Sequence, residues 1–329
     1  MGRWTTRATR GGALALLFLI LAVLPGTGLR PAAPLAAPMI LLGVAADDLE
    51  EANGLIAARA ARPAPIPTAP QQLVLGEVAQ KKAPGLSGPV TYVPVLYYHY
   101  IRINPSPRDR AGFSLSTPPA VFRAQMRYLA DHGFHVISLH QAVVAIKNHS
   151  GLPYRPLVLT FDDGYADFFT AAVPILHSYG FTATSFVITG RMGRGGFMTP
   201  NQVVAADGMG YTIGAHTVDH LALAAQAPAR ATWEMKQSKR TLEELLGHPV
   251  LDFAYPYGSF NQRDMAQAKS LGFETAVSTL SGALHSAGQL FELSRMRIGG
   301  GLPLANFAHV VGGPPPTPAE LLVTGASGP

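Results

Sequence analysis

The 329-residue sequence contains no cysteine. This absence excludes a disulfide framework, a thiolate metal site, a cysteine nucleophile and a lipid anchor on a cysteine. Charged residues are also scarce, at 14% of the chain, whereas hydrophobic residues make up 48%. That balance excludes a disordered, highly charged chain and predicts a sizeable buried core. The length allows one large folded domain with ancillary segments.

Acidic residues are absent from the first 46 positions, which hold four of the 25 basic residues. The remainder therefore carries 21 basic and 20 acidic residues and is nearly neutral, although the net charge of the whole chain is +5. A nucleic-acid-binding protein would keep a basic patch on its folded part. We therefore expect no nucleic-acid partner.

The amino-terminal segment is typical of an export signal. Three arginines within the first ten residues precede an apolar run over 13–24. A basic segment followed by about a dozen apolar residues directs a chain to the secretory apparatus. The run is shorter than the roughly 20 residues that cross a bilayer, but a second apolar patch over 38–44 could lengthen it. We expect residues 1–46 to be a signal peptide or membrane anchor, rather than a buried core helix. The protein would then be exported, and either secreted or anchored to the outer face of the cell membrane.

Two further segments differ in composition from a folded domain. Residues 47–88 are rich in proline and alanine, and proline at this density favours an extended, semi-rigid linker. Residues 313–329 resemble a flexible tail. The folded domain is therefore expected over 89–312.

In residues 90–300, short runs rich in β-branched residues alternate with stretches whose apolar residues recur with helical periodicity. Strands are expected at 93–98, 134–138, 157–161, 183–188, 211–215, 251–255, 273–278 and 294–298. Helices are expected at 119–132, 166–179, 231–246 and 261–271. Strands joined by helices predict an α/β fold, specifically a seven- or eight-stranded (β/α) barrel that is incomplete or distorted. In such barrels the chemistry lies at the carboxyl ends of the strands.

Two adjacent carboxylates, Asp162 and Asp163, directly follow the apolar strand at 157–161. Paired carboxylates are unfavourable unless a cation shares their site. One of them could bind a metal while the other stays free as a base, and Gly164 permits the sharp turn that both would need. A helix N-cap is the alternative explanation for either one alone.

Two histidines, His216 and His220, follow the strand at 211–215. Histidines four residues apart face the same way if the turn between them is helical, so both imidazoles can reach one metal. Such a pair is a short motif that also arises by chance, and its position directly after a strand strengthens it.

The third group is the turn Tyr255–Pro256–Tyr257–Gly258, which closes another predicted strand. It could line a sugar site and present a backbone N–H to an oxyanion, although a plain tight turn explains it equally well. One carboxylate and two imidazoles together form an open ligand set that suits zinc, while other divalent metals could serve.

These three groups, in this order, resemble the motifs of the polysaccharide deacetylases, the NodB-homology group also called carbohydrate esterase family four. The resemblance spans about 90–300. It implies a catalytic domain in which Asp162 is the base, while Asp163, His216 and His220 bind the metal. It also implies removal of N-acetyl groups from an amino-sugar polymer.

The sequence departs from the family pattern at two places. The family often has an arginine two residues before the proline of the third motif, where this chain has Ala254. Arg295, on the last predicted strand, could supply that charge, or it could be a surface arginine. The late histidine that acts as general acid has no convincing match after residue 280.

The segment 93–101 resembles the opening strand of poly-N-acetylglucosamine deacetylases, in which the order of elements is circularly permuted. That resemblance makes His99 the candidate general acid, the alternative being a histidine packed among tyrosines. Tyr257 would contribute its backbone N–H to the oxyanion.

Three other functions remain to be weighed against an N-deacetylase. An O-acetyl esterase acting on a xylan-like glycan could use the same site. A non-catalytic glycan-binding module of the same fold would explain the missing arginine but not the intact ligand set. A zinc protease fits less well, because no glutamate follows His216.

Overall fold

The computed structural model describes residues 86, 88–106 and 108–324. The expected signal or anchor segment at 1–46 and nearly all of the expected linker at 47–88 lie outside these residues. Within the part of the chain that is described, no helix combines the length and the apolar character needed to cross a membrane.

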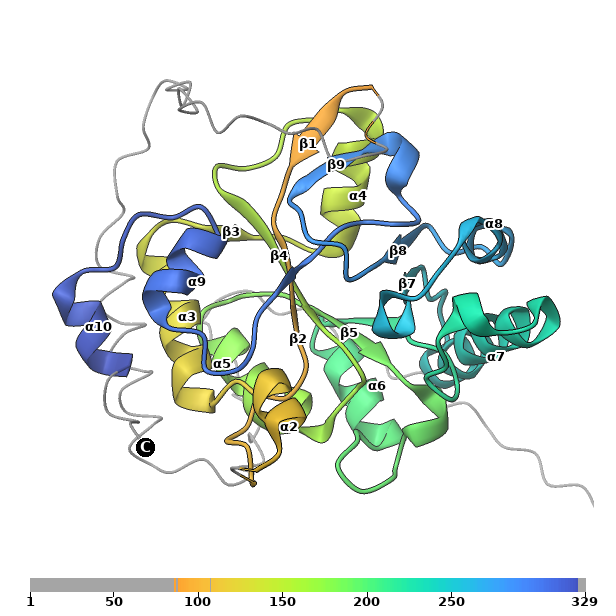
Figure 1. Ribbon diagram of the computed structural model, residues 1–329, viewed down its shortest axis with the longest axis horizontal. Coiled ribbons are helices and arrows are strands. Elements are labelled where there is room, and N and C mark those ends of the chain that lie inside the picture. The colour runs from red at the N-terminus through yellow and green to blue at the C-terminus, as the bar shows by residue number, and fades with distance from the viewer. Residues whose placement is uncertain (1–85, 87, 107, 325–329) are drawn as a thin grey trace, which may run out of the picture. The chain divides into compact units, whose positions relative to one another are not determined.

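The centre of the fold is a curled parallel sheet whose strands run in the order β10-β2-β4-β5-β6-β7-β8 (Figure 1). The strands are β2 (Val95–Tyr98), β4 (Pro156–Phe161), β5 (Thr184–Val187), β6 (Thr212–Ala215), β7 (Asp252–Ala254), β8 (Thr275–Val277) and β10 (Met296–Arg297). Strand β3 (His135–Val136) pairs with the first residues of β4. All eight predicted strands are therefore present, each within a few residues of its expected position.

The sheet closes on itself only loosely. Beyond β8, a single parallel bridge joins Val277 to Leu293, and the chain then continues into β10, which pairs with β2. The expected incomplete (β/α) barrel is confirmed. A separate antiparallel pair, β1 (Val90–Tyr92) with β9 (Leu284–Ser286), was not predicted from the sequence.

Helices connect successive strands and cover the outside of the sheet (Figure 1). They are α2 (Arg110–Leu115), α3 (Pro119–Asp131), α4 (Leu139–Asn148), α5 (Val173–Ser178), α6 (Pro200–Gly208), α7 (Pro228–Leu246), α8 (Gln262–Ser270), α9 (Leu304–Val310) and α10 (Pro318–Thr324). The helix expected at 166–179 begins as a π-helical turn, Phe168–Ala172, that leads directly into α5.

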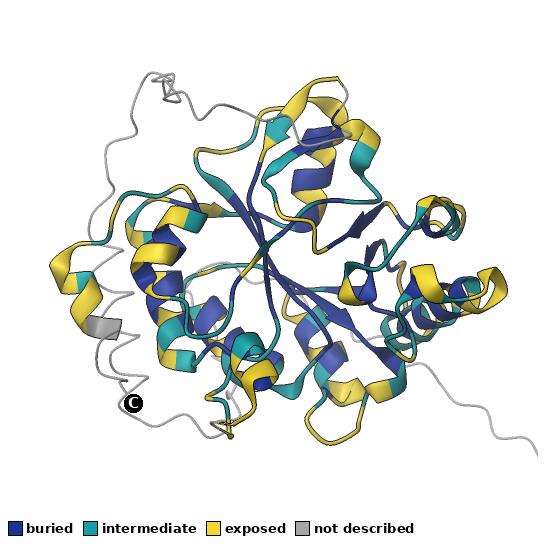
Figure 2. Ribbon diagram, in the orientation of Figure 1, coloured by how far each residue is buried: buried dark blue, intermediate teal, exposed yellow. Residues whose placement is uncertain are grey.

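The central strands are buried on both faces, as the dark ribbons of Figure 2 show. Every residue of β2 and β5 is buried, and so are five of the six residues of β4. The strands of a parallel sheet that is covered on both sides have continuous apolar sequences, and this is why these strands could be recognised. Inside, Tyr98 stacks on Phe161 with ring centres 5.2 Å apart.

The carboxyl-terminal segment corrects one expectation. Residues 313–324 do not form a loose tail, because α10 packs beside α3 and α9. Glu320 accepts a hydrogen bond from His132 at 2.9 Å, and Tyr128 donates to the carbonyl of Pro314 at 2.5 Å. Two polar contacts to α3 and its carboxyl end thus hold a segment whose proline and glycine content suggested disorder.

Candidate active site

The carboxyl ends of β4 and β6 bring three predicted metal ligands together. Asp163 follows β4, and His216 and His220 follow β6. One ligand atom from each of the three lies within 4.8 Å of the others. Asp163 and His216 are buried and His220 is partly buried. This is a compact donor set, enclosed on most sides.

The backbone at both strand ends is unusual. Asp163, Thr217 and His220 have φ angles of 76°, 65° and 58°, in the left-handed region that non-glycine residues rarely adopt. Such conformations cost about 1–3 kcal/mol each and cluster at functional sites. The turn between His216 and His220 is not helical, because the segment reverses through these left-handed residues, and the two imidazoles reach the same place by this other route.

Hydrogen bonds hold this irregular loop in place. The Oγ1 of Thr217 accepts from the backbone N–H of His220 at 3.0 Å. The buried carboxylate of Glu234, on α7, accepts from the backbone N–H groups of Val218 and Asp219 at 2.8 and 2.9 Å. Glu234 was not foreseen from the sequence, since nothing near it in the chain marks it.

The geometry around Asp163 fits a divalent cation. Its Oδ1 lies 3.4 Å from Nε2 of His216 and 3.2 Å from Nε2 of His220. This oxygen is buried and has no hydrogen-bond partner among the described residues, which is costly unless an ion compensates it. Burial raises the pKa of the Asp163 carboxyl, but the two neighbouring imidazoles hold it well below its usual range.

The orientation of His216 also suits a metal ligand. Its Nδ1 lies 2.7 Å from the carbonyl oxygen of Ala254, to which it can donate, so Nε2 points toward Asp163 with its lone pair available. Burial lowers the pKa of His216, but Asp163 beside it raises it, and the net direction is upward. A carboxylate with two imidazoles is a ligand set that zinc and other divalent metals accept.

Arg295 lies at the centre of the site, not at the surface. It is fully buried, and its guanidinium forms a bidentate pair with Asp162, with both N–O distances 2.7 Å. It also donates to Thr160 at 3.0 Å and to the carbonyl of Ser278 at 2.9 Å. Burial raises the pKa of Asp162, but the charge and hydrogen bonds of Arg295, together with the charges of His216 and His99, bring it below its usual value, so the carboxyl stays ionised.

His99 follows β2 and faces the same group of charges. Its Nδ1 is buried without a hydrogen-bond partner among the described residues. Burial lowers the pKa of His99, opposed by the carboxylates of Asp162 and Asp163. The ring lies edge-on to Tyr97 at 5.8 Å between centres, so it is near one tyrosine while its free nitrogen stays unsatisfied.

Tyr257 stands at the mouth of the site. It has a φ of 58° and a side chain that is 69% exposed. Its ring centre lies 4.5 Å from that of His220. Six of the seven residues singled out in the sequence thus lie just after the carboxyl end of a strand, and the seventh, Arg295, precedes β10 and reaches the site with its side chain.

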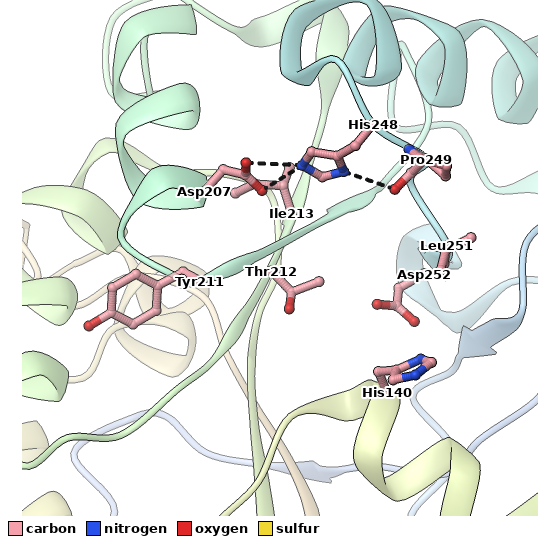
Figure 3. Close-up of a pocket in the computed structure, with 10 residues that line it drawn as sticks. His140, Asp207, Tyr211, Thr212, Ile213, His248, Pro249, Leu251 and Asp252 are labelled. Carbon is pink, nitrogen blue, oxygen red and sulfur yellow. Dashed lines mark hydrogen bonds and ion pairs between the residues drawn. The ribbon is translucent and has the colours of Figure 1, made fainter.

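A hollow of about 240 Å³ lies at the opposite end of the sheet, by the amino ends of β6 and β7 (Figure 3). His248 bonds there to the carboxylate of Asp207 at 3.0 Å, while His140 and Asp252 line the other side. Chemistry in barrels of this kind lies at the carboxyl ends, so we do not place the active site in this hollow.

Comparison with known proteins agrees with this geometry. A family model described as polysaccharide deacetylase matches residues 149–276. YxkH of Bacillus subtilis, a protein assigned to the polysaccharide deacetylases, is 30% identical over 219 residues, which cover 67% of this chain and 76% of that protein. The poly-beta-1,6-N-acetyl-D-glucosamine N-deacetylase of Escherichia coli K12 is 26% identical over 243 residues. Those residues span only 36% of its length.

The fold is also that of a solved deacetylase. The structure of a Streptococcus pyogenes deacetylase in complex with acetate superimposes with a TM-score of 0.63 and 32% identity, covering 67% of this chain and 98% of that one. Sequence identity, coverage and fold lead to one conclusion: the chain belongs to the polysaccharide deacetylase family, whose NodB-homology motifs it carries.

Proposed function

We propose that the protein is a metal-dependent N-deacetylase that acts on an amino-sugar polymer outside the cytoplasm. The observation that carries the proposal is that two groups of side chains lie next to each other. Asp163, His216 and His220 form an open ligand set, and beside them Asp162 is held ionised by Arg295. The amino-terminal sequence supports export, and the relative from E. coli is named for poly-N-acetylglucosamine.

Asp163, His216 and His220 would hold the metal, with zinc the best match to their donor atoms. When bound, the metal supplies a Lewis acid that polarises the acetamide carbonyl. The chain's own contribution begins with Asp162, which accepts a proton from the attacking water. Arg295 serves this role by orienting the carboxylate and by keeping it unprotonated in a buried place.

The remaining roles fall to His99 and Tyr257. The backbone N–H of Tyr257 would donate to the oxyanion that forms as water adds to the carbonyl. His99 would donate a proton to the departing nitrogen, because an amine anion is too basic to leave unaided. Water and the acetamide are thereby converted to acetate and a free amine.

The arginine at the centre of the site also bears on the alternatives. A non-catalytic module was attractive because Ala254 replaces the usual arginine, but Arg295 provides a guanidinium on Asp162 from the segment just before β10. An O-acetyl esterase would use the same residues, and only the substrate distinguishes it.

The decisive measurement is acetate release from N-acetylglucosamine oligomers by the full-length chain, with chelator and then with zinc restored. We expect release that the chelator stops and zinc restores. Release from acetylxylan but not from the oligomers would identify an O-acetyl esterase. Glycan binding without any release, from folded and metal-loaded protein, would identify a binding module.

Two matched variants separate the roles of the adjacent aspartates. Asp162→Asn should reduce turnover by about 10²–10⁴-fold, the usual range for a general base, while the protein keeps its bound zinc. Asp163→Asn should lose the zinc. Loss of metal from the Asp162 variant, with its fold intact by circular dichroism, would contradict the assignment.

A further inference from the structure

The loops at the carboxyl end of the barrel have few free acidic side chains. Apart from the pair at the site, the segments that follow the sheet strands contain Asp109, Asp167, Asp219 and Glu292, the last of which accepts a hydrogen bond from Gln289 at 3.3 Å. Asp109 caps α2, Asp219 is ion-paired with Arg230, and Asp167 is partly buried. The same loops carry five arginines outside the site: Arg102, Arg108, Arg110, Arg191 and Arg194.

Two of these arginines end a row of stacked side chains, which we call the stacked ladder: Arg102, Tyr100, Tyr165, Phe197 and Arg191. The guanidinium carbon of Arg102 lies 3.3 Å from the ring centre of Tyr100. Ring centres are 3.6 Å apart between Tyr100 and Tyr165, and 5.0 Å apart between Tyr165 and Phe197. The guanidinium carbon of Arg191 lies 5.4 Å from the centre of Phe197.

The stacked ladder is not a platform for a sugar ring. Two groups within 3.6 Å of the Tyr100 centre must lie on opposite faces, so neither face of that ring is free. A guanidinium that stacks by its face keeps its in-plane N–H groups, which match the oxygens of a carboxylate or phosphate. The part of the ladder available to a ligand is therefore its charged ends.

The ladder adjoins the proposed metal site. Tyr165 follows Gly164 in the loop after β4, close enough for the Asp163 carboxylate to act on its hydroxyl. Backbone hydrogen bonds of 2.9 Å join this loop to the one that bears Arg191, from Ala166 to Gly196 and from Met198 to Gly164. A group bound at the ladder would thus lie along the rim of the site.

Neither guanidinium group of the ladder is held in a direct ion pair. Among residues 86, 88–106 and 108–324, neither Arg102 nor Arg191 forms an ion pair with a carboxylate. Asp167 is the carboxylate on which Arg102 acts electrostatically. The field of Arg102 is thus partly offset by Asp167, whereas no carboxylate is paired with Arg191 among the described residues, and the net positive field would attract an anionic polymer.

We propose that each charged end of the stacked ladder binds one anionic substituent, a carboxylate or a phosphate, on the same glycan chain that presents the acetamido group to the site. This inference rests on the proposed deacetylase function and narrows its substrate class to acidic glycans. A neutral poly-N-acetylglucosamine would then be a poorer substrate than an amino-sugar polymer that carries acidic groups.

Three oligosaccharides of equal length test the proposal on the full-length, zinc-loaded protein. One is a neutral N-acetylglucosamine oligomer, one alternates N-acetylglucosamine with N-acetylmuramic acid, and one carries 6-phosphate groups. We expect higher kcat/KM for an anionic oligomer, with the preference declining as salt rises. The better of the two anionic arms identifies carboxylate or phosphate as the group bound.

The double variant Arg102→Gln/Arg191→Gln should reduce the anionic-to-neutral ratio of kcat/KM by about tenfold for each guanidinium, as for a hydrogen bond to a charged group. The control Arg127→Gln/Arg240→Gln removes the same charge from α3 and α7 and should leave the ratio unchanged. Equal kcat/KM for all three oligomers would overturn the inference while leaving the deacetylase in place. An equal loss on every oligomer, together with a lower melting temperature, would show that the arginines only stabilise the fold and would also overturn it.

If no oligomer releases acetate, the proposed function fails, and equilibrium binding then decides the inference separately. Tighter binding of an anionic oligomer than of the neutral one, abolished in the double variant, would still support an acidic-glycan site. Equal binding of both would overturn it.

Discussion

At the scale of single residues, the pair formed by Asp162 and Arg295 has the largest consequences for stability and for chemistry. Both side chains are almost completely buried, and two hydrogen bonds of 2.7 Å join them. A buried ion pair adds little net stability, because desolvation offsets the attraction between its members. Removing one member is costly, since the other charge is then left in the interior.

Arg295→Met should therefore reduce the free energy of unfolding by about 3–5 kcal/mol, the usual cost of a broken buried pair. The pKa of Asp162 should rise, because burial would no longer be opposed by the guanidinium. Urea unfolding at neutral pH measures the loss. The double variant Asp162→Leu/Arg295→Met should recover much of it, and the exposed Arg240→Met should change little. Full stability of the single variant would mean that the pair is not buried in solution.

The proposed metal ligands and the paired aspartates could be singled out from the sequence because each lies within a few residues of a strand end. The sequence shows such local groups directly. Glu234 could not be found this way, because its partners are 15 and 16 residues distant and meet it only when α7 packs. A role for Arg295 was suggested because Ala254 stands where the family often has an arginine. Its contact with Asp162 could not be read from the sequence, because 133 residues separate the two.

At the scale of elements, the turns after the strands shape the site. The turn after β7 has left-handed residues at Tyr257 and Gly258, with φ angles of 58° and 66°. A Cβ at Gly258 would lie 1.9 Å from the Oγ1 of Thr279, so glycine is needed both for conformation and for space. This turn holds Tyr257 over His220.

Gly258→Ala should thus lower both stability and deacetylation. Gly272→Ala is the matched control, because Gly272 also has a positive φ, of 81°, but no atom lies within 4 Å of its added Cβ. The control should cost about 1–2 kcal/mol, the penalty for a left-handed residue alone, and should keep its activity. Thermal unfolding and acetate release measure both effects. Equal losses for the two variants would show that the contact with Thr279 is relieved at no cost.

Two helices missing from the sequence prediction had a detectable signal. Both α4 and α6 begin with a capping box, formed by Ser138 with Gln141 and by Thr199 with Gln202, which is a recognisable start pattern. The pair of β1 and β9 had no such signal. Their partners, for example Val90 and Ser286, are brought together only by the tertiary fold.

At the scale of the whole molecule, the barrel has one chemically active end and one end that carries a buried acid. Asp252 begins β7 at the amino end, beside the hollow in Figure 3. Burial raises the pKa of Asp252 from 3.8 to about 7, helped by Glu274 and opposed by Lys239. The folded protein therefore holds this proton more tightly than the unfolded chain does.

The sign of the pH dependence follows from this raised value. The contribution of Asp252 to stability is fully present below about pH 4 and is lost as the pH rises through about 7. At 1.36 kcal/mol for each pH unit, the loss is at most about 4 kcal/mol. Asp252→Asn should accordingly be more stable than the unmodified protein at pH 8 and similar at pH 4, as measured by denaturant unfolding. The exposed Asp131→Asn is the control, and parallel pH profiles for the Asp252 variant and the unmodified protein would contradict the prediction.

The sequence predicted the barrel architecture, but it did not predict how the barrel closes. Alternating apolar strands and helices indicate a barrel, but the loose joint at Val277 and Leu293 depends on hydrogen bonds between segments with no distinctive sequence.

The closure of the barrel between Val277 and Leu293 affects when the proposed catalytic base is ready to act. Arg295 lies in the segment that closes the ring between β8 and β2, whereas Asp162 is made more than a hundred residues earlier. During synthesis the carboxylate proposed as the base therefore lacks its counter-charge until that segment has been made. Closing the ring supplies that charge, so closure of the barrel and the readiness of the proposed base are one event.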